Sequence, residues 1–101
     1  MQRIAVVCGA GASSTFIALG LRRAAAQRGI EIIATAHSLS GLGKIETTPD
    51  VILLGPHLAT EEKAVREGFP SARVVMLSDQ VVRTEDGSAA LEIVLSAGGQ
   101  Q

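Results

Sequence analysis

Residues 4–15 read Ile-Ala-Val-Val-Cys-Gly-Ala-Gly-Ala-Ser-Ser-Thr, and this stretch decides the fold class. Its first part, Ile4 to Cys8, is apolar at every position, which is typical of a central parallel strand that is covered on both faces. A loop of small residues follows from Gly9 to Ala12. An Ala-rich segment with apolar residues at helical spacing then continues to about Arg28, and Gly29 is expected to end it. The stretch therefore predicts a strand, a tight loop and a helix, in that order.

The same alternation of elements runs through the rest of the chain. Further strands are expected at residues 31–36, 50–54 and 73–77, further helices at 58–67 and 88–97, and polar segments at 38–49, with room for one helical turn, and at 78–87. Strands that alternate with helices favour βαβ units, which build a parallel sheet with right-handed crossovers. We therefore predict a single α/β domain over residues 1–101. Its sheet is expected to be an open, doubly wound, four-stranded parallel sheet in the order 2-1-3-4, with helices on both faces.

The composition excludes several classes of function. The chain has nine Lys and Arg against ten Asp and Glu, no Trp or Tyr, and two Phe, so it lacks the basic excess and the aromatic platform of a nucleic-acid binder. Its one cysteine, Cys8, excludes an internal disulfide and a multi-cysteine metal site. The apolar runs are far shorter than a membrane span needs, and the N-terminus lacks the long apolar stretch of a signal peptide. We expect a cytoplasmic domain with no nucleic-acid partner and no insertion into the membrane.

Cys8 is the candidate catalytic residue, because it ends the first strand at the switch point of the expected sheet, where ligands bind in such folds. The candidate phosphate-binding residues are the seven that follow it: Gly9, Ala10, Gly11, Ala12, Ser13, Ser14 and Thr15. Small residues let backbone N–H groups converge on an anion, Ser13 or Ser14 can cap the helix, and the helix N-terminus adds free donors. No carboxylate lies in this segment, so the same field is expected to lower the pKa of Cys8 and to produce an exposed thiolate that attacks phosphorus. The alternative is an inert apolar cysteine that closes a strand.

Other loop chemistries fit this segment poorly. A nucleotide P-loop requires a Lys, which is absent, and a dinucleotide fingerprint requires a final Gly where Ser14 stands. A phosphatase of the Cys-x5-Arg type would have Arg at that same position, and without this guanidinium the hydrolysis of a phosphate ester is expected to be poor. The loop is suited to hold a phosphoryl group and to pass it on. Two other classes stay open, a cysteine-dependent phosphatase-like enzyme and an anion-sensing regulatory module.

The two histidines, His37 and His57, are expected in loops at the same edge of the sheet as Cys8. His37 is interpreted as a solvent-facing loop residue, and His57 is a candidate neighbour of the phosphoryl group because Gly55-Pro56 fixes the turn before it. Asp79 is interpreted as a turn or cap residue. Two histidines in separate loops, without nearby carboxylates, do not make a metal site, so neither a metal nor another cofactor is expected.

The sequence resembles the enzyme IIB component of the phosphoenolpyruvate-dependent sugar phosphotransferase system, of the lactose/cellobiose type. Cys8 with Gly11, Ser13 and the hydroxyl run is similar to the Cys-x-x-Gly-x-Ser-[Thr/Ser]-Ser loop of that family. Residues 50–56, Asp-Val-Ile-Leu-Leu-Gly-Pro, are similar to its Asp-Val-[Val/Ile]-Leu-Leu-Gly-Pro stretch, and chain length and element order also agree. After this stretch the family commonly has Gln and, shortly afterwards, Tyr, where this chain has His57 and Thr60. That departure bears on the sugar class more than on the chemistry.

The resemblance implies a phosphocysteine carrier. Cys8 would accept a phosphoryl group from a phosphohistidine of enzyme IIA, held by the loop that follows, and would transfer it to a sugar bound by the membrane enzyme IIC during uptake. It implies a cytoplasmic protein that associates peripherally with the membrane permease. In this system the sugar is largely chosen by enzyme IIC.

Overall fold

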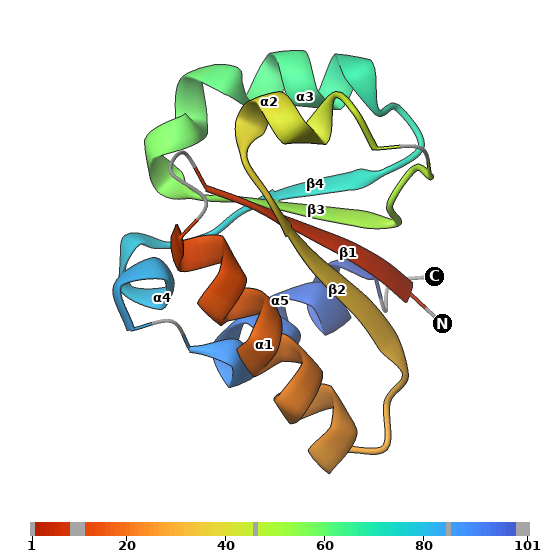
Figure 1. The fold of residues 1–101 in the computed structure, drawn as a ribbon, viewed down its shortest axis with the longest axis vertical. Helices are drawn as coiled ribbons and strands as arrows, with labels where there is room; N and C mark the ends of the chain where they lie inside the picture. The colour runs from red at the N-terminus through yellow and green to blue at the C-terminus, as the bar shows by residue number, and fades with distance from the viewer. Residues whose placement is uncertain (1, 9–11, 46, 85, 99–101) are drawn as a thin grey trace.

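The computed structural model describes residues 2–8, 12–45, 47–84 and 86–98. Four strands, β1 (Gln2–Val7), β2 (Ile32–His37), β3 (Val51–Leu54) and β4 (Arg73–Met76), form one parallel sheet in the order β2-β1-β3-β4. The helical elements are α1 (Ala12–Gln27), α2 (Leu39–Leu42), the 3₁₀ helix η1 (Pro56–Glu61), α3 (Glu62–Gly68), α4 (Asp79–Thr84) and α5 (Gly87–Gly98). Helices α1, α4 and α5 cover one face of the sheet, and α2 and α3 cover the other (Figure 1). The predicted fold class, strand order and two-faced arrangement are confirmed.

The core has two parts, one on each face of the sheet. The first, which we call the α1-side cluster, packs alternate residues of β1 (Ile4 and Val6) and Cys8 against α1 and α5, including Leu21 and Leu91. The second, the α2-side cluster, packs the other residues of β1, with β3, against side chains from α2, η1 and α3: Ala5, Val7, Ile52, Leu54, Leu42, Leu58 and Val65. Successive side chains of a strand point to opposite faces, so a strand buried on both faces must be apolar throughout. This explains the unbroken apolar run that opens the sequence.

Two glycines set the distance between α1 and α5. A Cβ atom on Gly87, the first residue of α5, would collide with the backbone of Gly20 in α1. The two helices therefore pack main chain against main chain at this point. The C-terminal end of α1 is set by Gly29, whose φ of 69° lies in the left-handed region that glycine tolerates.

Three predicted details at element ends are wrong. Helix α1 begins at Ala12, so Ser13 and Ser14 lie in its first turn and not at the N-cap position expected for one of them. The helix expected at 58–67 is instead the 3₁₀ helix η1 followed by α3, because the backbone at Leu58 leaves helical geometry (φ −102°, ψ 20°). Strand β2 extends one residue further than expected, so His37 ends a strand and does not lie in a loop.

The segment 78–87 is not a loop throughout, since it contains α4. The hydroxyl of Ser78 accepts a hydrogen bond from the Val81 amide at 3.2 Å, as an N-cap residue does. Asp79 is the first residue of this helix and pairs with Arg83 at 2.9 Å, so it is neither a turn nor a cap residue. The short helix combines a cap, an i,i+4 ion pair and one buried side chain, Val81.

Candidate functional site

Cys8 follows β1 directly and points into the α1-side cluster, where its side chain is only 2% exposed. Burial among apolar side chains raises the pKa of the Cys8 thiol above its ordinary value of 9.0, because water no longer stabilises the thiolate. The expectation of an exposed thiolate with a lowered pKa is therefore wrong for this structure. The physical reason is the alternation of β1: Ile4, Val6 and Cys8 project to the same apolar face. The resting side chain is a neutral thiol.

The predicted phosphate-binding segment is described only in part. Gly9, Ala10 and Gly11 lie outside the described residues, and Ala12 and Ser13 are described as backbone of the first turn of α1. Ser14 is fully buried and Thr15 is exposed, and neither side chain lacks a partner. The first turn of α1 contains no acidic residue. Helix α1 begins four positions after Cys8. Its first backbone N–H groups, and the positive end of its dipole, therefore lie at the carboxyl end of β1, as the sulfur does.

Gly55 brings His57 and Cys8 to one place. It follows β3, and its amide donates a hydrogen bond of 2.9 Å to the carbonyl of Val7, which fixes the end of β3 against the end of β1. A Cβ atom on Gly55 would lie 2.8 Å from Cε1 and 3.2 Å from Nδ1 of His57, and 3.4 Å from Sγ of Cys8. The imidazole and the thiol thus flank the same point above the backbone, with the ring of His57 at the surface. Pro56, at the start of η1, fixes the backbone turn between Gly55 and His57.

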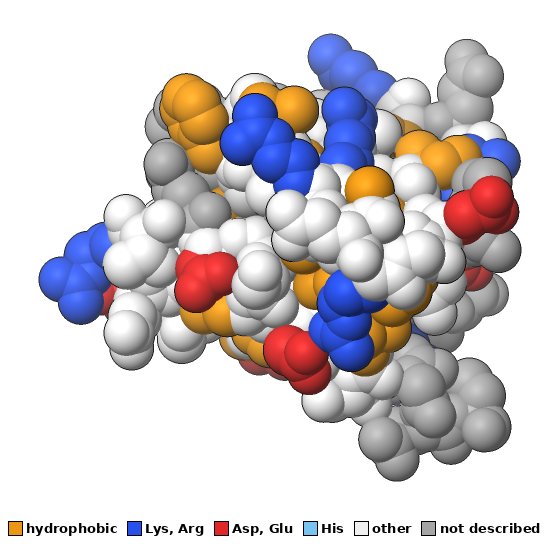
Figure 2. Space-filling view, turned by 90° about the horizontal axis from the view of Figure 1, so that it is seen from below, with side chains coloured by type: hydrophobic (Ala, Val, Ile, Leu, Met, Phe, Trp, Pro, Cys, Tyr) orange, Lys and Arg blue, Asp and Glu red, His pale blue; other side chains and the backbone are white. Residues whose placement is uncertain are grey.

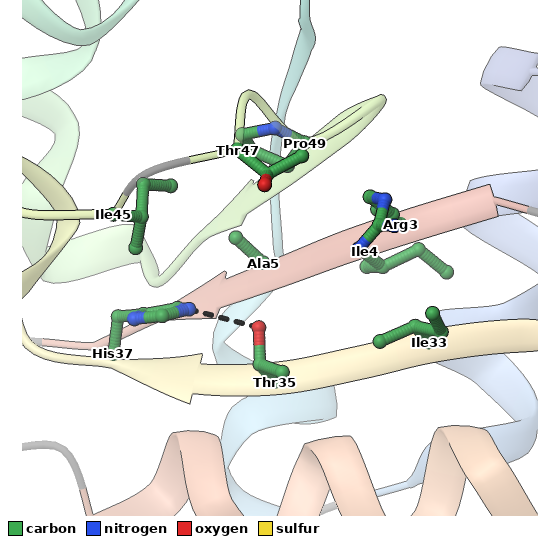
Figure 3. A pocket seen from close by; sticks show the side chains of 9 residues that line it. All are labelled: Arg3, Ile4, Ala5, Ile33, Thr35, His37, Ile45, Thr47 and Pro49. Carbon is green, nitrogen blue, oxygen red and sulfur yellow. Dashed lines mark hydrogen bonds between the residues drawn. The ribbon is translucent and has the colours of Figure 1, made fainter.

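His37 lies elsewhere. It is the last residue of β2, its ring is hydrogen-bonded to the hydroxyl of Thr35 at 2.8 Å, and it lines a cavity of about 300 Å³ on the α2 side of the sheet (Figure 3). That cavity is closed on one side by Ala5, which belongs to the α2-side cluster. Cys8 belongs to the cluster on the opposite face, so the sheet separates it from His37. Of the two histidines, the structure brings only His57 to the cysteine.

Within the part of the chain that the structure describes, no three His, Cys, Asp or Glu side chains gather where a metal ion could be held. No helix among these same residues is long and apolar enough to span a membrane.

Sequence reasoning missed two features, one beside Cys8 and one on α1. The first is the close approach of Gly55, which the apolar strand followed by Gly-Pro could have signalled. The second is the exposure of Phe16 and Leu19, at 56% and 40%, on the first turns of α1. Ile17 and Leu21 form the buried stripe of this helix, and Phe16 and Leu19 fall outside it. Figure 2, a view from the side of α1 and α5, shows hydrophobic side chains at the surface among those of Lys and Arg.

Comparison with known proteins identifies relatives of this fold and sequence. A family model described as "PTS system, Lactose/Cellobiose specific IIB subunit" matches residues 3–93. A search of curated proteins finds no match. Among solved structures, the lactose-specific IIB component domain from Streptococcus pneumoniae is 18% identical with a TM-score of 0.84, covering 95% of this chain and 96% of that one. The cellobiose-specific IIB component from Borrelia burgdorferi is 23% identical with a TM-score of 0.73, covering 95% and 90%. At these identities the structural likeness shows a shared fold.

Proposed function

Since this chain belongs to the lactose/cellobiose-specific IIB family of the phosphotransferase system, with a role in sugar phosphotransfer, we propose that Cys8 is its phosphoryl carrier. The observation that supports this most directly is the position of the thiol. It stands at the carboxyl end of β1, between the start of α1 and the turn at Gly55, where open α/β sheets bind ligands. In this proposal the donor is a phosphohistidine of enzyme IIA, and the acceptor is a sugar bound by the membrane enzyme IIC. The chain would act at the cytoplasmic side of that permease.

The neutral thiol has the protonation state that the net exchange needs. When Sγ of Cys8 attacks the donor, the S–P bond forms, the N–P bond of the phosphohistidine breaks, and the thiol proton passes to the imidazole nitrogen that is left behind. In the second transfer a sugar hydroxyl attacks phosphorus, the S–P bond breaks, and the hydroxyl proton returns to the sulfur. No additional proton is consumed in either step. Because burial raises the pKa of Cys8 and the thiolate is the stronger nucleophile, the proton leaves the sulfur as the S–P bond forms.

The surroundings of Cys8 supply donors for the phosphoryl oxygens. The amides at the start of α1 carry no intrahelical partner, and the helix dipole favours a dianion there. We assign His57 the role of a further donor, whose ring N–H reaches the phosphoryl group from the side of η1. Many members of the family carry Gln at this position, and a Gln side chain can donate a hydrogen bond but cannot act as a base. The shared property of the two side chains is therefore donation, not proton abstraction.

Cys8 is only 2% exposed, so its sulfur has to be uncovered before two partners can reach it in turn. We infer that docking of the phosphorylated partner opens the site, and that the thiol is shielded from other reagents until then. The Cys8 thiol of the isolated protein is therefore expected to react slowly with small electrophiles. With its docked, phosphorylated donor it is expected to react quickly.

The test is intact-mass spectrometry of the protein after incubation with phosphorylated enzyme IIA. The wild-type chain should gain one phosphoryl group, and Cys8→Ala should gain none. A Cys8→Ala protein that still acquires the group would overturn the assignment. Turnover of an aryl phosphate by the isolated protein would favour the phosphatase-like alternative. Protection of Cys8 from alkylation by inorganic phosphate, with no covalent transfer, would favour the anion-sensing module.

A further inference from the structure

At each outer edge of the sheet, an arginine side chain from a neighbouring helix donates a hydrogen bond to the backbone of the edge strand. Strands β2 and β4 are the edges. On β2, Arg22 of α1 donates from Nε and Nη2 to the carbonyl oxygen of Ala34, at 2.9 and 2.6 Å. On β4, Arg66 of α3 donates from Nη2 to the carbonyl oxygen of Val74, at 2.9 Å. Helices α1 and α3 lie on opposite faces of the sheet, so each face supplies the arginine for one edge (Figure 1).

On β4, the hydrogen bonds to β3 show that the carbonyl of Val74 points outward. The amide of Arg73 donates to the backbone carbonyl of Asp50 at 2.9 Å, and the amide of Leu77 donates to the backbone carbonyl of Leu54 at 2.7 Å. The backbone polar groups of a strand alternate between its two sides, so Val75 also faces β3, and Val74 faces away from the sheet.

The same reasoning applies to β2. The carbonyl of Val7 accepts from Gly55, so Val7 and Ala5 face β3 and the alternate residue Ile4 faces β2. Ala34 is the register partner of Ile4. In a parallel ladder, a residue forms its hydrogen bonds with the two neighbours of its register partner, not with the partner itself. Ile4 therefore bonds to Ile33 and Thr35, and the backbone N–H and C=O of Ala34 point away from β1, toward the outer edge of the sheet. Both arginines therefore occupy carbonyls that would otherwise pair with an added strand.

Unpaired edge groups are a template for another strand, and natural proteins block them with charged side chains. We propose that Arg22 and Arg66 are edge guards, which prevent the sheet from extending into a second copy of this chain. The guarded contact is a two-fold pairing of β2 with β2, because β2 has six residues and β4 has four. Arg22 is the stronger guard, since it places two donors on one oxygen. Arg66 is held in place by Glu62, whose Oε2 accepts from its Nε at 3.0 Å and its Nη2 at 2.6 Å.

This proposal is independent of the proposed function, because neither arginine takes part in the chemistry at Cys8. Its test is sedimentation velocity of the wild-type protein and of Arg22→Ala over a range of concentrations. The wild-type chain should remain monomeric, and Arg22→Ala should dimerise with an association constant raised about a hundredfold, roughly tenfold for the backbone carbonyl that is freed in each of the two copies. Arg23→Ala is the matched control, because Arg23 is the neighbouring exposed arginine of the same helix and should leave the association unchanged.

Hydrogen exchange locates the contact. In the Arg22→Ala dimer, the outward amides of Ala34 and Ala36 should become protected relative to the monomer. Arg22→Lys, which keeps one donor and the charge, should associate to an intermediate degree, and it serves as the test if Arg22→Ala does not fold. A wild-type dimer paired through β2, an Arg22 variant that stays monomeric at every concentration, or protection that appears away from β2 would each overturn the proposal.

Discussion

The two strands that flank β1 each lead into a histidine, and the two histidines have different surroundings. His37 ends β2, pairs with Thr35 and lines the cavity on the α2 side of the sheet. His57 follows β3 by way of Gly55 and Pro56, and its ring lies beside the sulfur of Cys8. In the sequence the two look alike, since each comes after a strand that is expected beside the first one. The difference teaches that the face of the sheet and the turn after the strand, more than the edge of the sheet, decide which side chains meet.

The largest expected effect comes from replacing His57, and the same replacement at His37 serves as the comparison. His57→Ala should slow phosphoryl acceptance by Cys8 about tenfold to a hundredfold, which is the effect of one lost hydrogen bond to a charged group. His37→Ala should leave the rate unchanged, because the sheet separates this residue from the sulfur. The measurement is the rate of phosphorylation by phosphorylated enzyme IIA, followed by intact mass under single-turnover conditions.

A second variant of the same residue separates donation from base catalysis. His57→Gln keeps an N–H donor but cannot take up a proton, so it should restore most of the wild-type rate. A rate for His57→Gln as low as that of His57→Ala would show that the ring acts as a base, and that the assigned role is wrong. Equal rates for His37→Ala and His57→Ala would remove the distinction between the two histidines altogether.

A methyl group on Gly55 tests the close approach itself. Gly55→Ala places a Cβ atom 2.8 Å from the ring of His57, so the imidazole must shift from its present position. We expect a loss of up to about tenfold in the phosphorylation rate, smaller than the loss from His57→Ala because a surface ring can readjust. Gly68→Ala is the control, since a Cβ atom there meets nothing within 4 Å. If both variants phosphorylate at the wild-type rate, the position of the His57 ring does not matter for the transfer.

The burial of Cys8 predicts a dependence of stability on pH. Because folding raises the pKa of the thiol, the folded chain holds its proton more tightly than the unfolded chain. The resulting stabilisation is fully present below the unfolded pKa, about 8.5–9, and is lost as the pH rises through the higher folded value. Urea unfolding at pH 7 and pH 10 should therefore show a larger loss of stability for the wild-type chain than for Cys8→Ala, which has no thiol to titrate. The same loss in both proteins would mean that another group causes it.

Much of this fold was predictable because burial leaves a direct trace in the sequence. The apolar run from Ile4 to Val7 marks a strand covered on both faces, and Gly29 marks the end of α1. Helix α4 was missed because it is short and has few apolar residues, although Asp79 and Arg83 stand at the i,i+4 spacing of an ion pair. Such local pairs are weak signals on their own, so a short helix depends on tertiary packing that the sequence does not display.

The chemical environment of the site was less predictable than its position. The sequence places Cys8 at the end of a central strand, and the register of β1 confirms that location. Its pKa depends on which face the sulfur meets, and the small, hydroxyl-rich segment after it suggested a polar setting. The alternation of Ile4, Val6 and Cys8 contained the opposite information, because it directs the sulfur to the apolar α1 side. The Gly55-Pro56 turn signalled that His57 lies near the site, but the close approach of Gly55 to the ring depends on the backbone path of that turn.

The smallest effect concerns the other histidine. Thr35→Val removes the hydroxyl that is hydrogen-bonded to His37 at 2.8 Å, with almost no change in shape. Both side chains are at least partly exposed, and water can replace the lost partner, so the free energy of unfolding should fall by about 0.5 kcal/mol. Urea denaturation measures this change, and phosphorylation of Cys8 by the donor should proceed at the wild-type rate. A slower transfer in Thr35→Val would show that the α2 side of the sheet communicates with the sulfur, so that the two histidines are coupled and do not belong to separate faces.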